Sequence, residues 1–150
     1  MRIAIAGAGA GGRSIAQTLL ALSHRVLLIE SRKQAYRPEQ VPAADWMWAD
    51  ACELSSLEGA GIDGCDVAVA TTGDDKVNLV FSYLCKTEFA VPRVIARIND
   101  AGNDWLFNAS WGVDVGVSAP RTAVAVVESV RLIDEIGGEV ATRARLGNRH

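Results

Sequence analysis

Short apolar runs alternate with longer segments in which apolar residues recur every three or four positions along this chain. The short runs predict β-strands at residues 2–6, 25–30, 46–49, 66–71, 93–97 and 113–117. Several of these runs are almost continuously apolar, which is typical of parallel strands that are covered on both faces. The periodic segments predict helices over residues 12–22, 53–59, 74–86, 101–110 and 121–136.

One connection departs from this regular alternation. Residues 32–45 contain Pro38 and Pro42, which leave room only for a short, broken helix. The remaining strand–helix alternation favours right-handed β-α-β units and therefore a doubly wound parallel α/β sheet. With one irregular crossover after the second strand, six strands fit the order 3-2-1-4-5-6.

A glycine-rich turn, residues 7–12, follows the first predicted strand and opens the first helix. Gly7, Gly9 and Gly12 match the pattern G-x-G-x-x-G. Such glycines allow a tight turn, a close approach of the backbone to a pyrophosphate and close packing of helix on sheet. Glu30 ends the second strand, near the spacing at which an acidic residue binds ribose hydroxyls. These features together predict a Rossmann-type fold that prefers NAD(H) or an adenosine nucleotide to NADP(H).

The fourth predicted strand ends in the sequence Thr71-Thr72-Gly73-Asp74-Asp75. In this topology the carboxyl ends of strands one and four flank the crevice where ligands bind. Thr72 and Gly73 are therefore expected to face the same nucleotide as the glycine turn. Asp74 and Asp75 have the alternative role of capping the next helix. Arg32 is expected to be a surface arginine rather than a 2′-phosphate site.

Composition and charge narrow the class of protein. The 150 residues are 49% apolar and carry a net charge of −3, which fits one globular domain and argues against a nucleic-acid-binding surface. The three cysteines are odd in number and lack metal-ligand spacing, so they are expected to be buried, reduced thiols. No apolar run is long enough to predict a membrane span or a secretory signal.

Several further stretches of the sequence, beyond the glycine turn, match the pattern of one protein family. The stretches to consider, besides "GAGAGG" and Glu30, are "ADACELSSLEGAGIDGCDVAVATTGDDKVNL" and "VPRVIARINDAGN". Together they resemble the N-terminal nucleotide-binding domain, or RCK domain, of the TrkA/KtrA family of potassium uptake regulators. The resemblance runs from Ile3 to about Leu132. It implies a regulatory subunit that binds NAD or NADH, with ATP or ADP as the alternative ligand.

The resemblance also implies a role for each ligand-contacting position. The backbone of residues 7–11 would bind phosphate, Glu30 would bind the adenosine ribose, and residues 50–51 would border the adenine. Arg97 would reach the ligand or a partner subunit. The implied positions are Gly7, Ala8, Gly9, Ala10, Gly11, Gly12, Glu30, Asp50, Ala51, Thr71, Thr72, Gly73, Asp74, Asn78 and Arg97.

This chain departs from the family pattern at two positions. Ala49 stands where the family usually has glycine, and Ala10 stands where some members carry an arginine that contacts nucleotide phosphates. The missing arginine favours NAD(H) over ATP, although Arg13 offers a partial substitute.

The resemblance further implies an organisation and a set of partners. Residues 1–119 are expected to form the nucleotide-binding core and residues 120–137 a crossover helix that packs on a second subunit. Residues 138–150 are expected to be a polar tail or the start of a linker, without the family's second, C-terminal ligand domain. The implied assembly is a homodimer or higher homo-oligomer in the cytoplasm. It would lie at the inner face of the membrane through a potassium transporter subunit, with no direct membrane insertion and no nucleic acid.

Two other classes of function stay open from the sequence. An NAD-dependent dehydrogenase, or its isolated coenzyme domain, would need a proton donor or acceptor beside the nicotinamide. The two histidines do not offer one, because His24 lies at the amino end of the sheet and His150 is terminal. Tyr83 and Lys86 fall one residue short of the spacing Y-x-x-x-K. The third class is a passive interaction module in which the nucleotide is structural. We therefore expect a protein that is not an enzyme.

Overall fold

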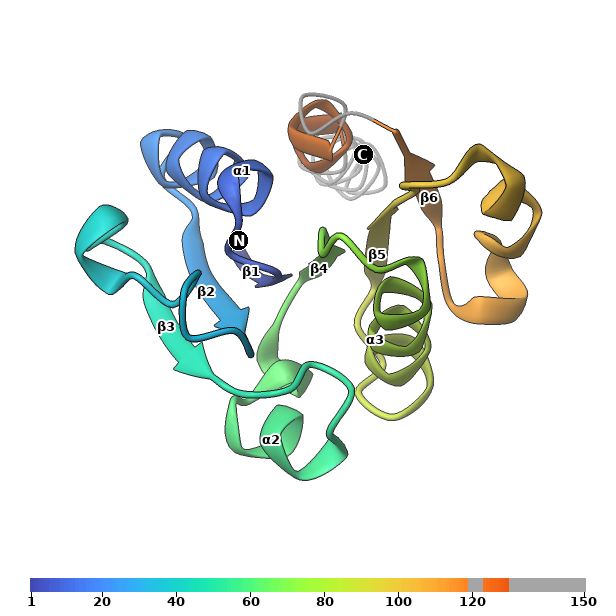
Figure 1. Ribbon diagram of the computed structural model, residues 1–150, viewed down its shortest axis with the longest axis horizontal. Helices are drawn as coiled ribbons and strands as arrows, with labels where there is room; N and C mark the ends of the chain where they lie inside the picture. The colour runs from blue at the N-terminus through green and yellow to red at the C-terminus, as the bar shows by residue number, and fades with distance from the viewer. Residues whose placement is uncertain (119–122, 130–150) are drawn as a thin grey trace, which may run out of the picture.

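The computed structural model describes residues 1–118 and 123–129, and its centre is a parallel sheet of six strands. Neighbouring strands follow the order β3-β2-β1-β4-β5-β6 (Figure 1), so the predicted doubly wound sheet and its strand order are confirmed. The register of each parallel pair is regular, with Ala6 opposite both Ile29 and Ala70. The strands are β1 (Arg2–Ala6), β2 (Arg25–Glu30), β3 (Asp45–Trp48), β4 (Val67–Ala70), β5 (Arg93–Arg97) and β6 (Val115–Val117).

Helices cover both faces of this sheet. Helix α1 and the helical residues 123–129 lie on one side, and α2 and α3 lie on the other (Figure 1). Because side chains alternate across a strand, each strand contributes to both cores. Ile3 and Ile5 pack with the α1 side, whereas Ala4 and Ala6 pack with the α2 and α3 side. The α-helices are α1 (Ala10–Ala21), α2 (Leu54–Gly59) and α3 (Asp75–Thr87).

The helix predicted over residues 101–110 is wrong. The segment instead forms two 3₁₀ turns, Ala101–Leu106 and Ala109–Trp111. The side chains of Asp100 and Asn108 each accept a hydrogen bond from a backbone N–H two residues ahead. Local side-chain bonds of this kind compete with a continuous helix, and they divide the segment into short turns.

The other expected elements lie within two residues of their predicted bounds. Between β2 and β3, the described residues form one short 3₁₀ turn, Pro38–Gln40, as the two prolines indicate. Of the helix predicted over residues 121–136, the structure describes residues 123–129, which are helical. The rest of that helix and the predicted tail lie outside the described residues.

A polar contact joins the helical residues 123–129 to the amino end of the sheet, which is the end away from the glycine turn. His24 is buried in the turn between α1 and β2, and its Nε2 atom lies 2.8 Å from Glu128 Oε1. Ala123 and Val127 are fully buried against the α1 side of the sheet. This part of the chain is therefore packed on its own sheet. Among the described residues, no helix is long and apolar enough to cross a membrane.

Candidate functional site

A cleft of about 510 Å³ opens at the carboxyl ends of β1, β2, β4 and β5. Its position is the point at which the strand order reverses, where doubly wound sheets bind ligands. The volume is in the range of small-molecule and cofactor sites. The cleft is lined by Gly7, Gly9, Glu30, Ser31, Arg32, Thr71, Thr72, Gly73, Asp74, Val77 and Arg97.

The glycine turn forms one wall of the cleft, and its glycines have different tasks. Gly7 has φ +102°, a conformation that side chains rarely adopt. A Cβ atom on Gly12 would lie 1.9 Å from the carbonyl oxygen of Gly7, so Gly12 permits the close contact of helix and turn. A Cβ atom on Gly9 would meet only the end of the Arg32 side chain, 3.9 Å away. Gly9 therefore leaves backbone open toward the cleft, as the motif predicts for the approach of a phosphate.

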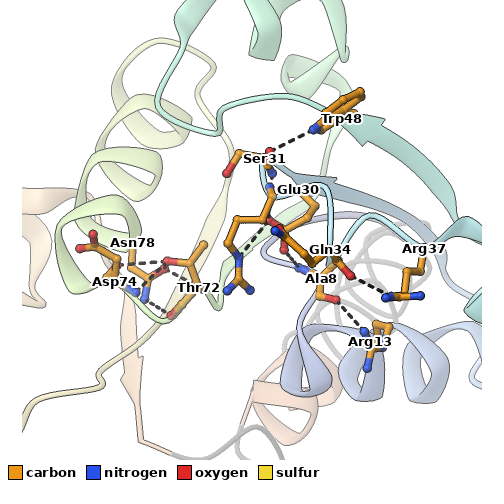
Figure 2. A network of polar contacts seen from close by, with 11 residues as sticks. Ala8, Arg13, Glu30, Ser31, Gln34, Arg37, Trp48, Thr72, Asp74 and Asn78 are labelled. Atoms are coloured by element: carbon orange, nitrogen blue, oxygen red, sulfur yellow. Dashed lines mark hydrogen bonds and ion pairs between the residues drawn. The ribbon is translucent and has the colours of Figure 1, made fainter.

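The carboxylate of Glu30 holds the glycine turn against the end of β2 (Figure 2). Its Oε1 atom accepts a hydrogen bond from the backbone N–H of Ala8 at 3.0 Å. Its Oε2 atom accepts from the N–H groups of Ser31 and Arg32 at 2.9 and 3.0 Å. Glu30 is 5% exposed and lines the cleft, and Oε1 keeps a further lone pair for a ligand hydroxyl. The side chain predicted to bind ribose is thus also the one that shapes the turn.

Asn78 lies beside Thr72, on the opposite side of the cleft from the glycine turn, and is hydrogen-bonded to Thr72 (Figure 2). Its Oδ1 atom accepts from the backbone N–H and the hydroxyl of Thr72, at 2.9 and 2.7 Å. Its amide nitrogen donates to the carbonyl oxygens of Thr72 and Arg97. The side chain is fully buried and all of its bonding groups are used. Asn78 therefore joins the ends of β4 and β5 and does not line the cleft, although the family resemblance implied a ligand contact.

Replacing Asn78 by alanine should lower the free energy of unfolding by about 2–4 kcal/mol, because its four hydrogen bonds to the partly buried Thr72 and Arg97 are lost. Urea denaturation measures this change. Lys76→Ala, at an exposed position of the same helix, is the matched control and should change stability by less than about 0.5 kcal/mol. Equal stability of the two variants would contradict the supporting role of Asn78.

Asp75 fixes the chain that leaves β5 against the start of α3. Its Oδ1 atom accepts from the backbone and side-chain nitrogens of Asn99, and its Oδ2 atom from Asp100 N and Asn103 Nδ2, all within 2.8–3.0 Å. Partial burial acts to raise the pKa of Asp75, but these hydrogen bonds outweigh it, so the pKa lies below its ordinary value. From the sequence, Asp75 is expected only to cap the following helix. The acidic pair after β4 and the "RIND" sequence after β5 were the available signals.

The lowered pKa of Asp75 predicts how stability depends on pH. The stabilisation is complete above the pKa of an unfolded aspartate, about 4, and is lost as pH falls through the lower pKa of the folded state. Asp75→Asn should therefore be less stable at neutral pH and should lose less stability on acidification. Thermal unfolding followed from pH 7 downward tests this, with the exposed Asp63→Asn as a control for charge. Parallel pH profiles for Asp75→Asn and the unchanged protein would refute the prediction.

Among the described residues, two buried polar side-chain atoms lack a hydrogen-bond partner, Thr71 Oγ1 and Arg97 Nε. Thr71 is 6% exposed, and both residues line the cleft. Buried donors and acceptors are nearly always paired, so such atoms call for an explanation. A ligand with an anionic or hydroxyl group could supply the missing partners.

The predicted site residues divide into three groups in the structure. Gly7, Gly9, Glu30, Thr71, Thr72, Gly73, Asp74 and Arg97 line the cleft. Ala8, Ala10, Gly11 and Gly12 belong to the turn or the first residues of α1, and Asn78 lies beneath the cleft. Asp50 and Ala51 lie outside the lining, where Asp50 accepts a hydrogen bond from the backbone of Cys52.

Three lining residues were not predicted to contact a ligand: Ser31, Arg32 and Val77. The Arg32 side chain is 69% exposed and its Nε atom lies 3.9 Å from Glu30 Oε2. Arg32 is thus a surface arginine, as expected, but it also borders the cleft. Its position two residues after the acidic residue was the signal that could have identified it.

None of the described cysteines is a lining residue of the cleft, but Cys52 Sγ lies 3.9 Å from the carbonyl oxygen of Val77, which does line it. Burial, followed by the negative charges of Asp50 and Asp74, raises the pKa of Cys52 to about 11. Burial also raises the pKa of Cys65 and of Cys85. All three thiols are free. Across residues 1–118 and 123–129, no group of three or more His, Cys, Asp or Glu side chains is arranged to hold a metal ion.

A six-stranded, doubly wound sheet with a glycine turn, an acidic residue at the end of β2 and a cleft at the switch point defines a Rossmann-type nucleotide-binding domain. The profile of the TrkA-N domain matches residues 3–119. The chain belongs to the TrkA-N domain family, which confirms the resemblance found in the sequence.

Relatives and solved structures agree with this assignment. The Trk system potassium uptake protein TrkA of Mycobacterium tuberculosis is 51% identical over 136 residues, which are 91% of this chain and 62% of that protein. A TrkA homolog of Methanothermobacter thermautotrophicus is 31% identical over 131 residues, which are 87% of this chain and 60% of that protein. The chain thus spans about three fifths of these relatives.

The GsuK channel, solved with NAD bound, has a TM-score of 0.67 and 25% identity. The match covers 89% of this chain and 24% of that one. GsuK solved with ADP bound has a TM-score of 0.68 and 25% identity, over 86% of this chain and 33% of that one.

Proposed function

We propose that this chain is the nucleotide-binding regulatory domain of a Trk potassium uptake system and that its cleft binds NAD or NADH, with ATP or ADP as the alternative. The observation that carries the proposal is the meeting of the glycine turn and the Glu30 carboxylate at one cleft. The relatives named as TrkA potassium uptake proteins support the transport context. GsuK, solved with NAD and with ADP, supports the class of ligand.

The residues present fit a dinucleotide. Gly9 and Gly73 carry no side chain, and a Cβ atom at Gly73 would meet nothing within 4 Å. No side chain caps the start of α1, so its first N–H groups and the positive end of its dipole stay available to a pyrophosphate. The free lone pair of Glu30 Oε1 suits a ribose hydroxyl, and its negative charge disfavours a 2′-phosphate. These residues bind and orient the ligand.

We also propose that the domain binds its ligand without chemical turnover. In the part of the chain that the structure describes, no His, Lys, Tyr or Cys lines the cleft. Of its two carboxylates, Glu30 accepts three backbone hydrogen bonds and Asp74 accepts the N–H of Lys76 at the start of α3. A dehydrogenase would place a proton donor or acceptor beside the nicotinamide. The lining therefore favours a sensor over the dehydrogenase alternative.

Regulation would follow from a shift between subunit arrangements. A ligand changes such an equilibrium only if it binds one arrangement more tightly than the other. We propose a homodimer or higher homo-oligomer that contacts the cytoplasmic face of a membrane potassium transporter. The expected crossover helix at residues 120–137, whose described residues 123–129 pack on their own sheet, would also contact the second subunit. The TrkA relatives supply the support for this transporter partner.

Sedimentation velocity of the chain, run with and without NAD, tests the proposal together with NADH absorbance. The proposal predicts an oligomer whose distribution changes with NAD, and an NADH signal that stays constant with candidate acceptors. A monomer at all protein concentrations with NAD bound would contradict the assembly. Steady NADH oxidation would instead favour a dehydrogenase, and binding without any change in assembly would favour a passive module.

A further inference from the structure

Thr71 and Arg97 lie side by side on the sheet face that α1 and residues 123–129 cover. Ala70 of β4 pairs with Ala96 of β5, so the next residues of the two strands are neighbours. Side chains alternate along a strand, and Ile95 belongs to the core on the α1 side. Thr71 and Arg97 therefore project from the sheet toward that same side, although they stand at its carboxyl edge.

These two residues also line a second, narrow cavity, which we call the seam. The seam lies between the sheet, α1 and Ala123, and it is too narrow to hold a water molecule. Its lining consists of Ile15, Val69, Ala70, Thr71, Arg97, Val117 and Ala123. Apart from Thr71 and Arg97, the side chains around the seam are apolar. Among the described residues, the seam therefore offers no side-chain partner to Thr71 Oγ1 or Arg97 Nε.

Within the described part of the chain, the cleft is the side from which a partner can reach these two atoms. Thr71 and Arg97 are the described residues that line both the cleft and the seam. The guanidinium of arginine is charged, and its fixed N–H groups suit phosphate and carboxylate oxygens. Gly9 and the start of α1 lie at the same cleft, where a phosphate is expected.

We propose that Arg97, together with Thr71, couples ligand binding to residues 123–129. An anionic group bound in the cleft accepts hydrogen bonds from both side chains and thereby stabilises the packing of residues 123–129 over the seam. This inference rests on the proposed nucleotide binding and adds the route by which binding reaches the rest of the molecule. Without an anion, an unpaired charged group borders the apolar seam and weakens the packing of Ala123. When an anion is bound, the Arg97 guanidinium has a partner and Ala123 packs more firmly over the seam.

Hydrogen exchange of the full chain, with ADP and with neutral adenosine as probes, tests the coupling. Saturating ADP should slow amide exchange in residues 123–129 by roughly fivefold or more, because a buried donor gains its partner. Saturating adenosine should protect the cleft but leave these residues unchanged. Arg97→Met removes the charge and keeps an apolar stem. This variant should bind ADP with lower affinity. Once it is saturated with ADP, amide exchange in residues 123–129 should not slow.

Two further variants keep the test decisive. Thr71→Val keeps the volume and removes the unpaired hydroxyl, so it should fold at least as stably and show a smaller slowing with ADP. His24→Ala loosens residues 123–129 from the far side, away from the cleft, and should raise their exchange while preserving the response to ADP. Equal slowing in Arg97→Met, or ADP binding that leaves residues 123–129 unchanged, would overturn the coupling alone. Failure of both ADP and NAD to bind would overturn the proposed function, and the coupling with it.

Discussion

Replacing Gly12 by alanine should destabilise the fold by about 3 kcal/mol or more and abolish nucleotide binding. The added Cβ atom would lie 1.9 Å from the carbonyl oxygen of Gly7 and 2.9 Å from its carbonyl carbon. Both neighbours are backbone atoms, so relief requires movement of the whole glycine turn. Urea denaturation and calorimetric titration with NAD measure the two effects.

Gly9→Ala is the matched control for Gly12→Ala. Its Cβ atom would meet only a flexible arginine terminus, so the variant should keep the stability of the unchanged protein. It should nevertheless bind NAD more weakly, because the methyl group occupies the backbone surface offered to the phosphate. A stable Gly12→Ala, or a Gly9→Ala that binds NAD with unchanged affinity, would show that the turn does not act as described.

Replacing Glu30 by alanine should lower both stability and nucleotide affinity. Three backbone N–H groups lose a charged acceptor, which predicts a loss of about 2–4 kcal/mol in the free energy of unfolding. Loss of a charged partner for the ribose should weaken NAD binding by roughly tenfold to a hundredfold. Thermal unfolding and calorimetric titration test the two parts separately.

Glu30→Gln distinguishes the structural role of Glu30 from its role in ligand choice. Glutamine keeps the size and one acceptor oxygen but removes the negative charge. It should fold more stably than Glu30→Ala and should reduce the preference for NAD over NADP, because the repulsion of the 2′-phosphate is gone. A Glu30→Gln protein with the full preference for NAD would show that another residue, such as the neighbouring Arg32, sets the choice.

The parts of the fold and of the candidate site that can be predicted from the sequence depend on short-range patterns of residues. Residues 2–22 form a strand, a glycine turn and a helix that neighbouring residues alone predict. Glu30 follows at a fixed position in the next strand. The strand order followed from alternation and handedness rather than from any single residue. Each of these inferences needed only the order of residues along the chain.

The features that sequence did not give depend on contacts between distant segments. Residues 101–110 are the exception, because local side-chain hydrogen bonds such as that of Asp100 break their helical pattern. The role of Asn78 beneath the cleft depends on two strand ends that meet only in the folded sheet. The network of Asp75 likewise joins segments more than twenty residues apart. No local pattern specifies these partners.

Calorimetric titration of the chain with NAD and with NADP tests the central claim, that Glu30 and the glycine turn together bind an adenosine dinucleotide. The account predicts saturable binding of one NAD per chain, weaker binding of NADP, and the loss of this difference in Glu30→Gln. Absence of heat with either coenzyme, or equal affinity for both in the unchanged protein, would contradict it.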